Sequence, residues 1–184
     1  MLAGVLLTAP LAGCTTIVAG SATEAVPSLT LASTQVASYP AGQRHVTGDV
    51  DYAEDPPVGG PHDPSWADCT GSVYDVAIRP ENAVHSLEHG AVWLTYDPDL
   101  TDADDVAVLA DLVTGRPGLL LSPYPGLGTA ASAQAWNHAV RVDDVHDPRL
   151  AAFADLLALN PDTTPEPGAS CENPAFLADP ETDR

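Results

Sequence analysis

Apolar residues in the middle of the chain recur in two patterns, and each pattern predicts one type of secondary structure. A helix is expected over residues 81–89, because Pro80 suits a first helical turn and Gly90 supplies a stop. The run at 91–96 that follows is apolar and rich in residues that favour strands. It predicts a buried strand directly after the helix.

Two further helices are predicted by apolar residues that lie three and four positions apart. The first follows Thr101, which we expect to cap it together with Asp104. Its apolar stripe consists of Val106, Leu109, Ala110 and Val113, and Gly115 ends it. The second opens at Asp147 and Pro148, and its inward residues are Leu150, Phe153 and Leu157.

Three more segments are expected to be strands, at residues 44–52, 119–121 and 133–142. In the last of these, one face should carry Trp136, His138, Val140 and Val142. Helices and strands are mixed along the chain without a regular repeat. The sequence therefore predicts a single small α+β domain with a mixed or antiparallel sheet and about three helices.

The first fourteen residues predict the compartment. A short apolar run leads into Leu-Ala-Gly-Cys at 11–14, which is the pattern of a bacterial lipobox. Residues 1–13 would then be a signal peptide, removed before lipid is attached to Cys14. Export signals begin with positive charge, and none precedes this run, so we expect the true translation start to lie upstream of Met1. The alternative is a chance apolar N-terminus with a buried cysteine.

A lipidated Cys14 divides the rest of the chain into three parts and places the protein in the cell envelope, on the extracytoplasmic side of the membrane. Residues 14–40, rich in Ser, Thr and Ala, predict a flexible tether. Residues 41–172 hold the folded domain. Residues 173–184 are expected to be an acidic tail without periodic structure.

The charge of the chain restricts its partners. It carries 26 acidic and 6 basic residues, for a formal net charge of −20. Nucleic acid is excluded as a partner, because its phosphates need neutralising cations. Charge also cannot hold the chain on anionic lipid, so membrane contact should depend on the lipid of Cys14. No motif indicates a particular protein partner.

Two cysteines remain if Cys14 carries lipid. An even pair in an exported chain predicts a disulfide between Cys69 and Cys171. The alternative is that Cys69 is a free thiolate that binds a metal ion.

The predicted helix at 81–89 carries the main candidate chemistry. His85 and His89 are four residues apart and share one helix face, as a chelating pair requires. Glu88 lies beside them as a third ligand, a carboxylate that orients an imidazole, or a general base. His62 lies in a stiff loop rich in proline and glycine and is the best candidate for a third histidine ligand. The alternative is a hydrogen-bonded histidine cluster with a purely structural role.

An ordered set of motifs resembles the domain-of-unknown-function family 3105, from about residue 52 to 171. The motifs are Pro-Pro-Val-Gly-Gly-Pro-His at 56–62, Trp66-x-x-Cys69, Tyr74, the segment 81–93, Leu-Ser-Pro-Tyr-Pro at 121–125 and Pro-Glu-Pro-Gly-x-x-Cys at 165–171. The chain departs from the family pattern at 69–71, where Cys-Gly is usual. The resemblance implies a prokaryotic protein, commonly exported or membrane-attached, without an established reaction.

The same resemblance selects the site residues. The positions that match its motifs are His62, Trp66, Cys69, Tyr74, His85, Glu88 and His89. The positions that fall outside the motifs, and that we leave out of the predicted site, are His45, His138 and His146.

The donor types restrict the metal. The single methionine is Met1, so a thioether copper(I) site is excluded, and three imidazoles suit copper(II) or zinc. We therefore predict an extracytoplasmic metal-binding lipoprotein that uses His62, His85 and His89, with Glu88 orienting a ligand. One alternative is a metal-dependent hydrolase with Glu88 as general base, and the segment 85–89 also fits the pattern H-x-x-E-H of inverted zinc peptidases. The other is a non-catalytic structural module of the envelope. A binding role is favoured over an enzyme.

Overall fold

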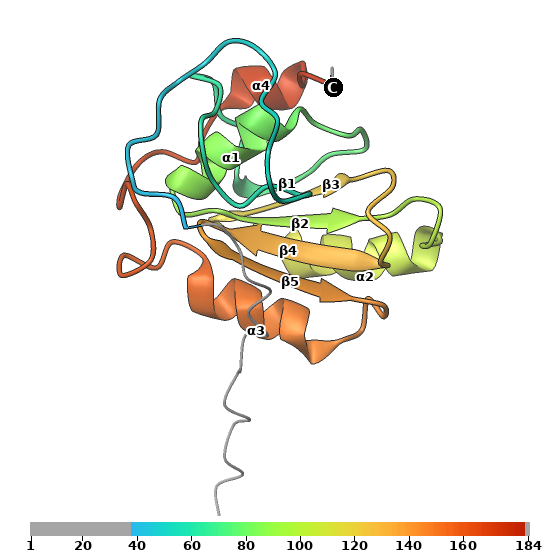
Figure 1. Cartoon of the computed structure of the whole chain (residues 1–184). Helices are drawn as coiled ribbons and strands as arrows, with labels where there is room; N and C mark the ends of the chain where they lie inside the picture. The colour runs from blue at the N-terminus through green and yellow to red at the C-terminus, as the bar shows by residue number, and fades with distance from the viewer. Residues whose placement is uncertain (1–37, 183–184) are drawn as a thin grey trace, which may run out of the picture.

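Strand β2 (Val92–Tyr96) lies in the middle of a five-stranded sheet with helices on both faces (Figure 1). The computed structural model describes residues 38–182, and this range also contains four helices. The remaining elements in chain order are β1 (Thr70–Val73), α1 (Pro80–Glu88), α2 (Ala103–Val113), β3 (Leu119–Pro123), β4 (Ala131–Ala135), β5 (His138–Val142), α3 (Pro148–Leu157) and α4 (Pro174–Ala178).

The sheet is mixed, with strand order β1-β3-β2-β4-β5. Strands β1, β3 and β2 pair in parallel, and β4 and β5 add an antiparallel half. Parallel neighbours need a crossover connection, and α2 supplies it between β2 and β3. The predicted α+β fold with a mixed sheet is therefore confirmed.

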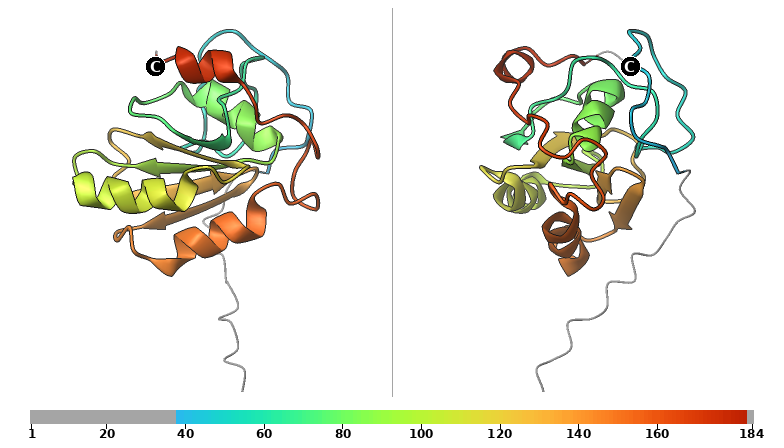
Figure 2. Two further views of the ribbon diagram at one scale, coloured as in Figure 1. Left: turned by 180° about the vertical axis from the view of Figure 1, so that it is seen from behind. Right: turned by 90° about the vertical axis from the view of Figure 1, so that its left-hand side faces the viewer.

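The central strands have apolar residues on both faces because both faces are covered. In β2, Val92, Leu94 and Tyr96 pack in the core beneath α2 and α3. Trp93 points to the opposite face and packs with residues of α1. Figure 2 shows α1 and α4 on one side of the sheet and α2 and α3 on the other. A strand buried on both faces becomes a continuous apolar run, which is the pattern the sequence has at 91–96.

Two of the predicted strands differ from the structure: one does not form, and the other is divided into two strands. Residues 44–52 do not form a strand; they contain one isolated β-bridge, between His45 and His62. The segment 133–142 is a hairpin of β4 and β5, which turns at Asn137 with φ 61°. Asparagine tolerates this left-handed conformation better than most residues.

The hairpin also overturns the predicted common face. Trp136 packs on the α1 side of the sheet, whereas Val140 and Val142 pack on the side of α2 and α3. The turn at Asn137 separates Trp136 from the later residues, so the alternation expected for one continuous strand does not hold across it.

The predicted helices are present, with one shifted cap and one unexpected addition. Asp102, not Thr101, caps α2 and forms a capping box with Asp105. Helix α3 starts after Asp147 as predicted. Helix α4 lies within the stretch predicted to be an unstructured acidic tail, and it is held to the core by the buried Phe176.

Strand β1 was not predicted either. It joins the edge of the sheet beside β3, and its four residues include one buried side chain, Ser72. A strand held mainly by backbone pairing has no apolar pattern to reveal it.

The features predicted for the N-terminus lie outside the described part of the chain. These are the signal peptide at 1–13, the lipid on Cys14 and most of the tether at 14–40. Between residues 38 and 182, no helix combines the length and the apolar character needed to cross a bilayer.

Candidate metal centre

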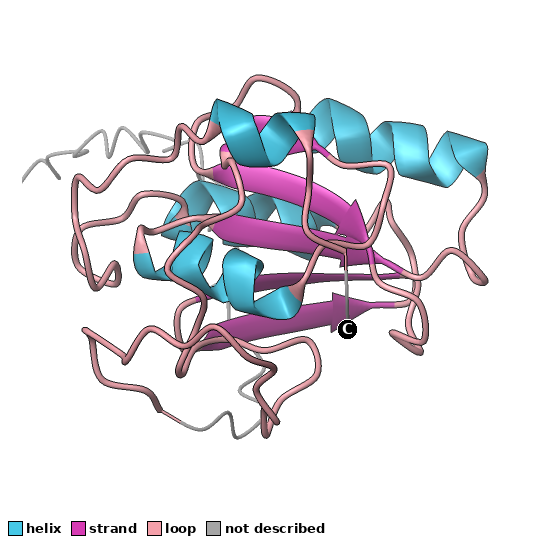
Figure 3. Ribbon diagram, turned by 90° about the horizontal axis from the view of Figure 1, so that it is seen from above, coloured by secondary structure: helices cyan, strands magenta, loops and turns pink. Residues whose placement is uncertain are grey.

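The C-terminal end of α1 supplies three of the candidate residues. His85 and Glu88 lie in its last turn and His89 forms its C-cap, and all three are buried. The helix stops there because Gly90 adopts a φ of 98°, and a Cβ at this position would lie 2.5 Å from Thr164 Oγ1. Long loops surround the helices on this side of the sheet (Figure 3, pink).

His62 comes from the proline- and glycine-rich loop and has no exposed surface. Gly59 and Gly60 give the loop its shape, with φ values of 157° and 112°. Tyr39 packs so closely over Gly59 that a Cβ there would lie 2.9 Å from its ring. The loop therefore places His62 beside α1.

The segment that carries His45 and His62 is also fixed to the start of α1. Arg79, just before the helix, forms an ion pair with Asp63 at 2.8 Å. Glu81, in the first turn, accepts a hydrogen bond from the backbone N–H of Val50 at 2.7 Å. These contacts hold a stretch of chain without strands or helices against the start of α1, and hydrogen bonds from Gly42 and Gln43 to Glu88 hold it against the last turn.

Four imidazoles lie in contact at this place. The ring centroids of His62 and His85 are 4.8 Å apart, and those of His85 and His89 are 4.5 Å apart. His45, an exposed residue, stacks near both His62 and His85 at 5.0 and 4.9 Å. His45, His62 and His85 each offer one ligand atom, and these atoms all lie within 4.8 Å of one another.

Backbone carbonyls select the tautomer of three of these rings. Nδ1 donates to Gly60 O in His62, to Asp63 O in His85 and to Ser170 O in His89, at 2.7–2.9 Å. A carbonyl can only accept, so each Nδ1 carries the proton. In a neutral ring the lone pair is then on Nε2, and metal-ligating histidines usually have this arrangement.

Glu88 orients the group from one side. Its Oε1 accepts the backbone N–H groups of Gly42 and Gln43 at 2.8 and 3.2 Å. Its Oε2 lies 3.0 Å from Nε2 of His62, but the two groups are not aligned as a hydrogen bond. The buried Nε2 of His62 therefore has no hydrogen-bond partner within the described chain, although it faces a carboxylate.

Burial sets the charge of the cluster. It lowers the pKa of His85 to about 4, and the neighbouring charge of His89 acts in the same direction. Burial also lowers the pKa of His89. For Glu88, burial alone would raise the pKa, but His62 and the two backbone N–H groups lower it overall. At neutral pH, His85 and His89 are thus neutral ligands beside a carboxylate anion.

The three-histidine group fits a zinc or copper ion after its ligand atoms move closer together. Two nitrogens bound to one tetrahedral ion at 2.0–2.1 Å are about 3.3–3.5 Å apart. The ligand atoms of the group lie within 4.8 Å of one another, so the widest pair allowed by this limit must close by a little over 1 Å. His45 is exposed and can supply this movement.

The structure brings together two of the three predicted histidine ligands, His62 and His85, and joins His45 to them. His89 lies next to His85, but it is not a member of the group whose ligand atoms meet. The predicted site omits His45 because this residue matches none of the motifs of the family. His138 hydrogen-bonds a carbonyl at its own hairpin turn, and neither it nor the exposed His146 belongs to the three-histidine group.

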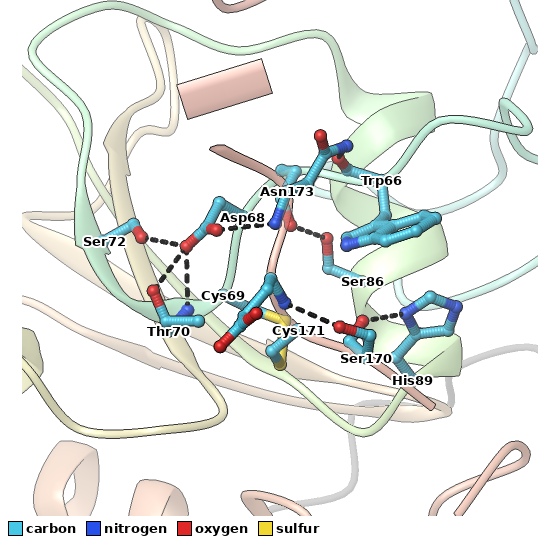
Figure 4. The surroundings of a disulfide bond; sticks show 12 residues. Trp66, Asp68, Cys69, Thr70, Ser72, Ser86, His89, Ser170, Cys171 and Asn173 are labelled. Atoms are coloured by element: carbon cyan, nitrogen blue, oxygen red, sulfur yellow. Dashed lines mark hydrogen bonds between the residues drawn. A yellow bond between two sulfur atoms is a disulfide. The ribbon is translucent and has the colours of Figure 1, made fainter. Parts of the chain in front are cut away.

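The predicted disulfide between Cys69 and Cys171 is present and adjoins the cluster (Figure 4). Cys69 is therefore not a thiolate ligand. Its backbone N–H also donates to the Cys171 carbonyl at 3.0 Å. The neighbouring Ser170 provides the carbonyl that accepts the hydrogen bond of His89. By holding Cys171 in place, the disulfide therefore also helps to position the imidazole of His89.

Comparison with known families gives one match. The family described as "Protein of unknown function (DUF3105)" matches residues 45–173, which includes the three histidines and both disulfide cysteines. Searches of curated proteins and of solved structures find no match.

Proposed function

Since the chain belongs to this family of proteins of unknown function, its role has to be argued from its site, and we propose that it is an extracytoplasmic, lipid-anchored protein that binds a copper or zinc ion through His45, His62 and His85. The observation that carries the proposal is the meeting of three imidazole donors whose ligand atoms lie within 4.8 Å. The lipobox at Cys14 supports the location.

The position of the His62 Nε2 atom favours metal binding over a purely structural cluster. This nitrogen is fully buried and makes no aligned hydrogen bond, and the Oε2 atom of Glu88 lies 3.0 Å from it. A metal ion bound by this nitrogen would use its lone pair, and the nearby carboxylate would balance the charge of the ion.

The contacts of Glu88 favour a binding protein over a hydrolase. A general base needs a carboxylate oxygen that can reach water and a pKa close to the working pH. One oxygen of Glu88 accepts from Gly42 and Gln43, the other lies 3.0 Å from Nε2 of the buried His62, and the pKa of Glu88 is lowered. Glu88 is therefore suited to balance the charge of an ion.

The donor set agrees with either metal. Neutral imidazole nitrogens suit both zinc and copper(II), and the exposed His45 gives an ion access to an otherwise buried group. A carboxylate beside the ligands lowers the cost of placing a divalent charge there.

The test is the metal content of the purified full chain after exposure to Zn(II) or Cu(II) and removal of loosely bound ions. We expect His62→Ala and His85→Ala to lose the ion bound by this group, and His146→Ala, an exposed histidine outside it, to retain it. Glu88→Gln should keep the ion with affinity lowered by no more than about 100-fold. A wild-type chain that binds no ion, and loses stability in every variant, would show a structural cluster instead.

A further inference from the structure

His89 does not join the three-histidine group, yet its free ring nitrogen faces another potential ligand. Nδ1 is held by Ser170 O at 2.7 Å, so Nε2 is the atom available for binding. It lies 3.8 Å from Oε2 of Glu166, which is too long for a hydrogen bond. Two ligands of one tetrahedral zinc ion are about 3.3–3.5 Å apart, so this pair needs only a small closure to share an ion.

The backbone holds Glu166 at this place. Its N–H donates to the carbonyl of Glu88 at 3.0 Å, which satisfies one of the open carbonyls at the end of α1. The carbonyl of Glu166 accepts from Ala169 at 3.1 Å in a tight turn. The side chain is about half exposed, at 48%, so an ion bound by it would be open to solvent.

The surroundings of His89 favour a cation. The residue is the C-cap of α1, where the partial negative charge of the helix end attracts positive charge. The charges of Glu166 and Glu88 both act on its ring in the same sense. The Trp66 ring packs against the ring of His89, with the centroids 5.0 Å apart.

Trp66 covers the histidines at the end of α1. Its ring also packs against that of His85, with the centroids 5.6 Å apart, so it lies along both His85 and His89. Figure 4 shows Trp66 and His89 beside the disulfide that anchors Ser170.

We propose that His89 and Glu166 form a second divalent-metal site, which binds a zinc or copper ion next to the one held by His45, His62 and His85. This proposal rests on the proposed function, because the second ion would lie beside the ion that His45, His62 and His85 are proposed to bind. Glu88 carries negative charge 3.0 Å from His62, and this charge also acts on His89, so it offsets the repulsion between two ions. With two protein ligands and water, the second site is the weaker and more exchangeable one.

The experiment is a Zn(II) titration of the full chain by calorimetry, with the number of bound ions counted by native mass spectrometry. The wild type should bind two ions, the second at least tenfold more weakly than the first. His89→Ala should bind one ion, and Glu166→Gln should weaken the second by tenfold or more. Two matched controls should keep both ions. They are Glu172→Gln, which changes an exposed carboxylate of the same C-terminal segment, and His146→Ala.

The variants distinguish a failure of the second metal site from a failure of the proposed function. His62→Ala should lose the tight ion and keep the weak one, and two Cu(II) ions in the wild type should show mutual broadening in electron paramagnetic resonance. One ion in the wild type overturns the second site and leaves the first standing if His89→Ala retains that ion. If His89→Ala loses it, the second site is overturned and the single ion depends on His89. No ion in the wild type overturns both proposals.

Discussion

Acid should destabilise the metal-free protein through His85, and the size of the effect follows from its surroundings. The usual pKa of histidine is 6.5, and burial lowers that of His85 to about 4 in the folded chain. At a pH between these two pKa values, the imidazole of His85 binds a proton in the unfolded chain but not in the folded chain. Stability must therefore fall as the pH falls through this window.

The linkage relation gives the magnitude. With a pKa of 6.5 in the unfolded chain and about 4 in the folded chain, the free energy of unfolding should fall by about 2 kcal/mol between pH 7 and pH 5. The lowered pKa of His89 acts in the same direction, because it too is a base that burial keeps neutral. Glu88 also destabilises the folded chain when it is protonated, but its pKa is lowered from 4.5, so this loss occurs at a pH below the window between 7 and 5.

The assay is urea unfolding of the full chain at pH 7, 6 and 5 with a chelator present, followed by circular dichroism. The comparison is with His85→Asn, whose amide can still donate to the Asp63 carbonyl that Nδ1 of His85 contacts. The loss of stability between pH 7 and pH 5 should be about 2 kcal/mol smaller in this variant. His146→Asn changes an exposed histidine and should keep the wild-type pH dependence. The same pH dependence in His85→Asn and the wild type would refute the buried neutral imidazole.

Two other changes test parts of the protein away from the cluster. The double variant Cys69→Ser and Cys171→Ser opens a covalent loop that joins residues 102 positions apart, and chain-entropy models predict a loss of up to about 4–5 kcal/mol in the free energy of unfolding, measured with urea; an unchanged midpoint would contradict a stabilising disulfide. Cys14→Ser should move the protein from the membrane fraction to the soluble fraction, and continued membrane fractionation would disprove the lipobox assignment.

The sequence alone determined the elements that depend on neighbours in the chain. Helix α1 was predicted from Pro80 and Gly90 to within one residue, because a fixed φ at its start and a positive φ at its end are local properties. The shared face of His85 and His89 followed from the helical repeat. The runs that form β2 and β3 were recognised because strands buried on both faces are apolar throughout.

The disulfide and His62 were also within reach of the sequence, for different reasons. If Cys14 is set aside as the lipidated residue, the two remaining cysteines leave one possible connectivity, so Cys69 and Cys171 could be paired by counting. His62 was marked by the stiff loop around it, and the structure confirms that this loop brings its ring to within 4.8 Å of that of His85.

Only the tertiary structure decided which histidines meet. His45 lies in an irregular segment, and its place beside His62 and His85 depends on a β-bridge and on contacts between the loop and α1. His89 is turned toward Glu166 by the Ser170 carbonyl, which lies 81 positions away in the chain. Strand β1 and helix α4 also depend on residues far away in the chain. The strand pairs with β3, and the helix is held by the packing of Phe176 in the core. Such contacts form between residues far apart in sequence and depend on how the whole chain packs, so a local sequence pattern does not predict them.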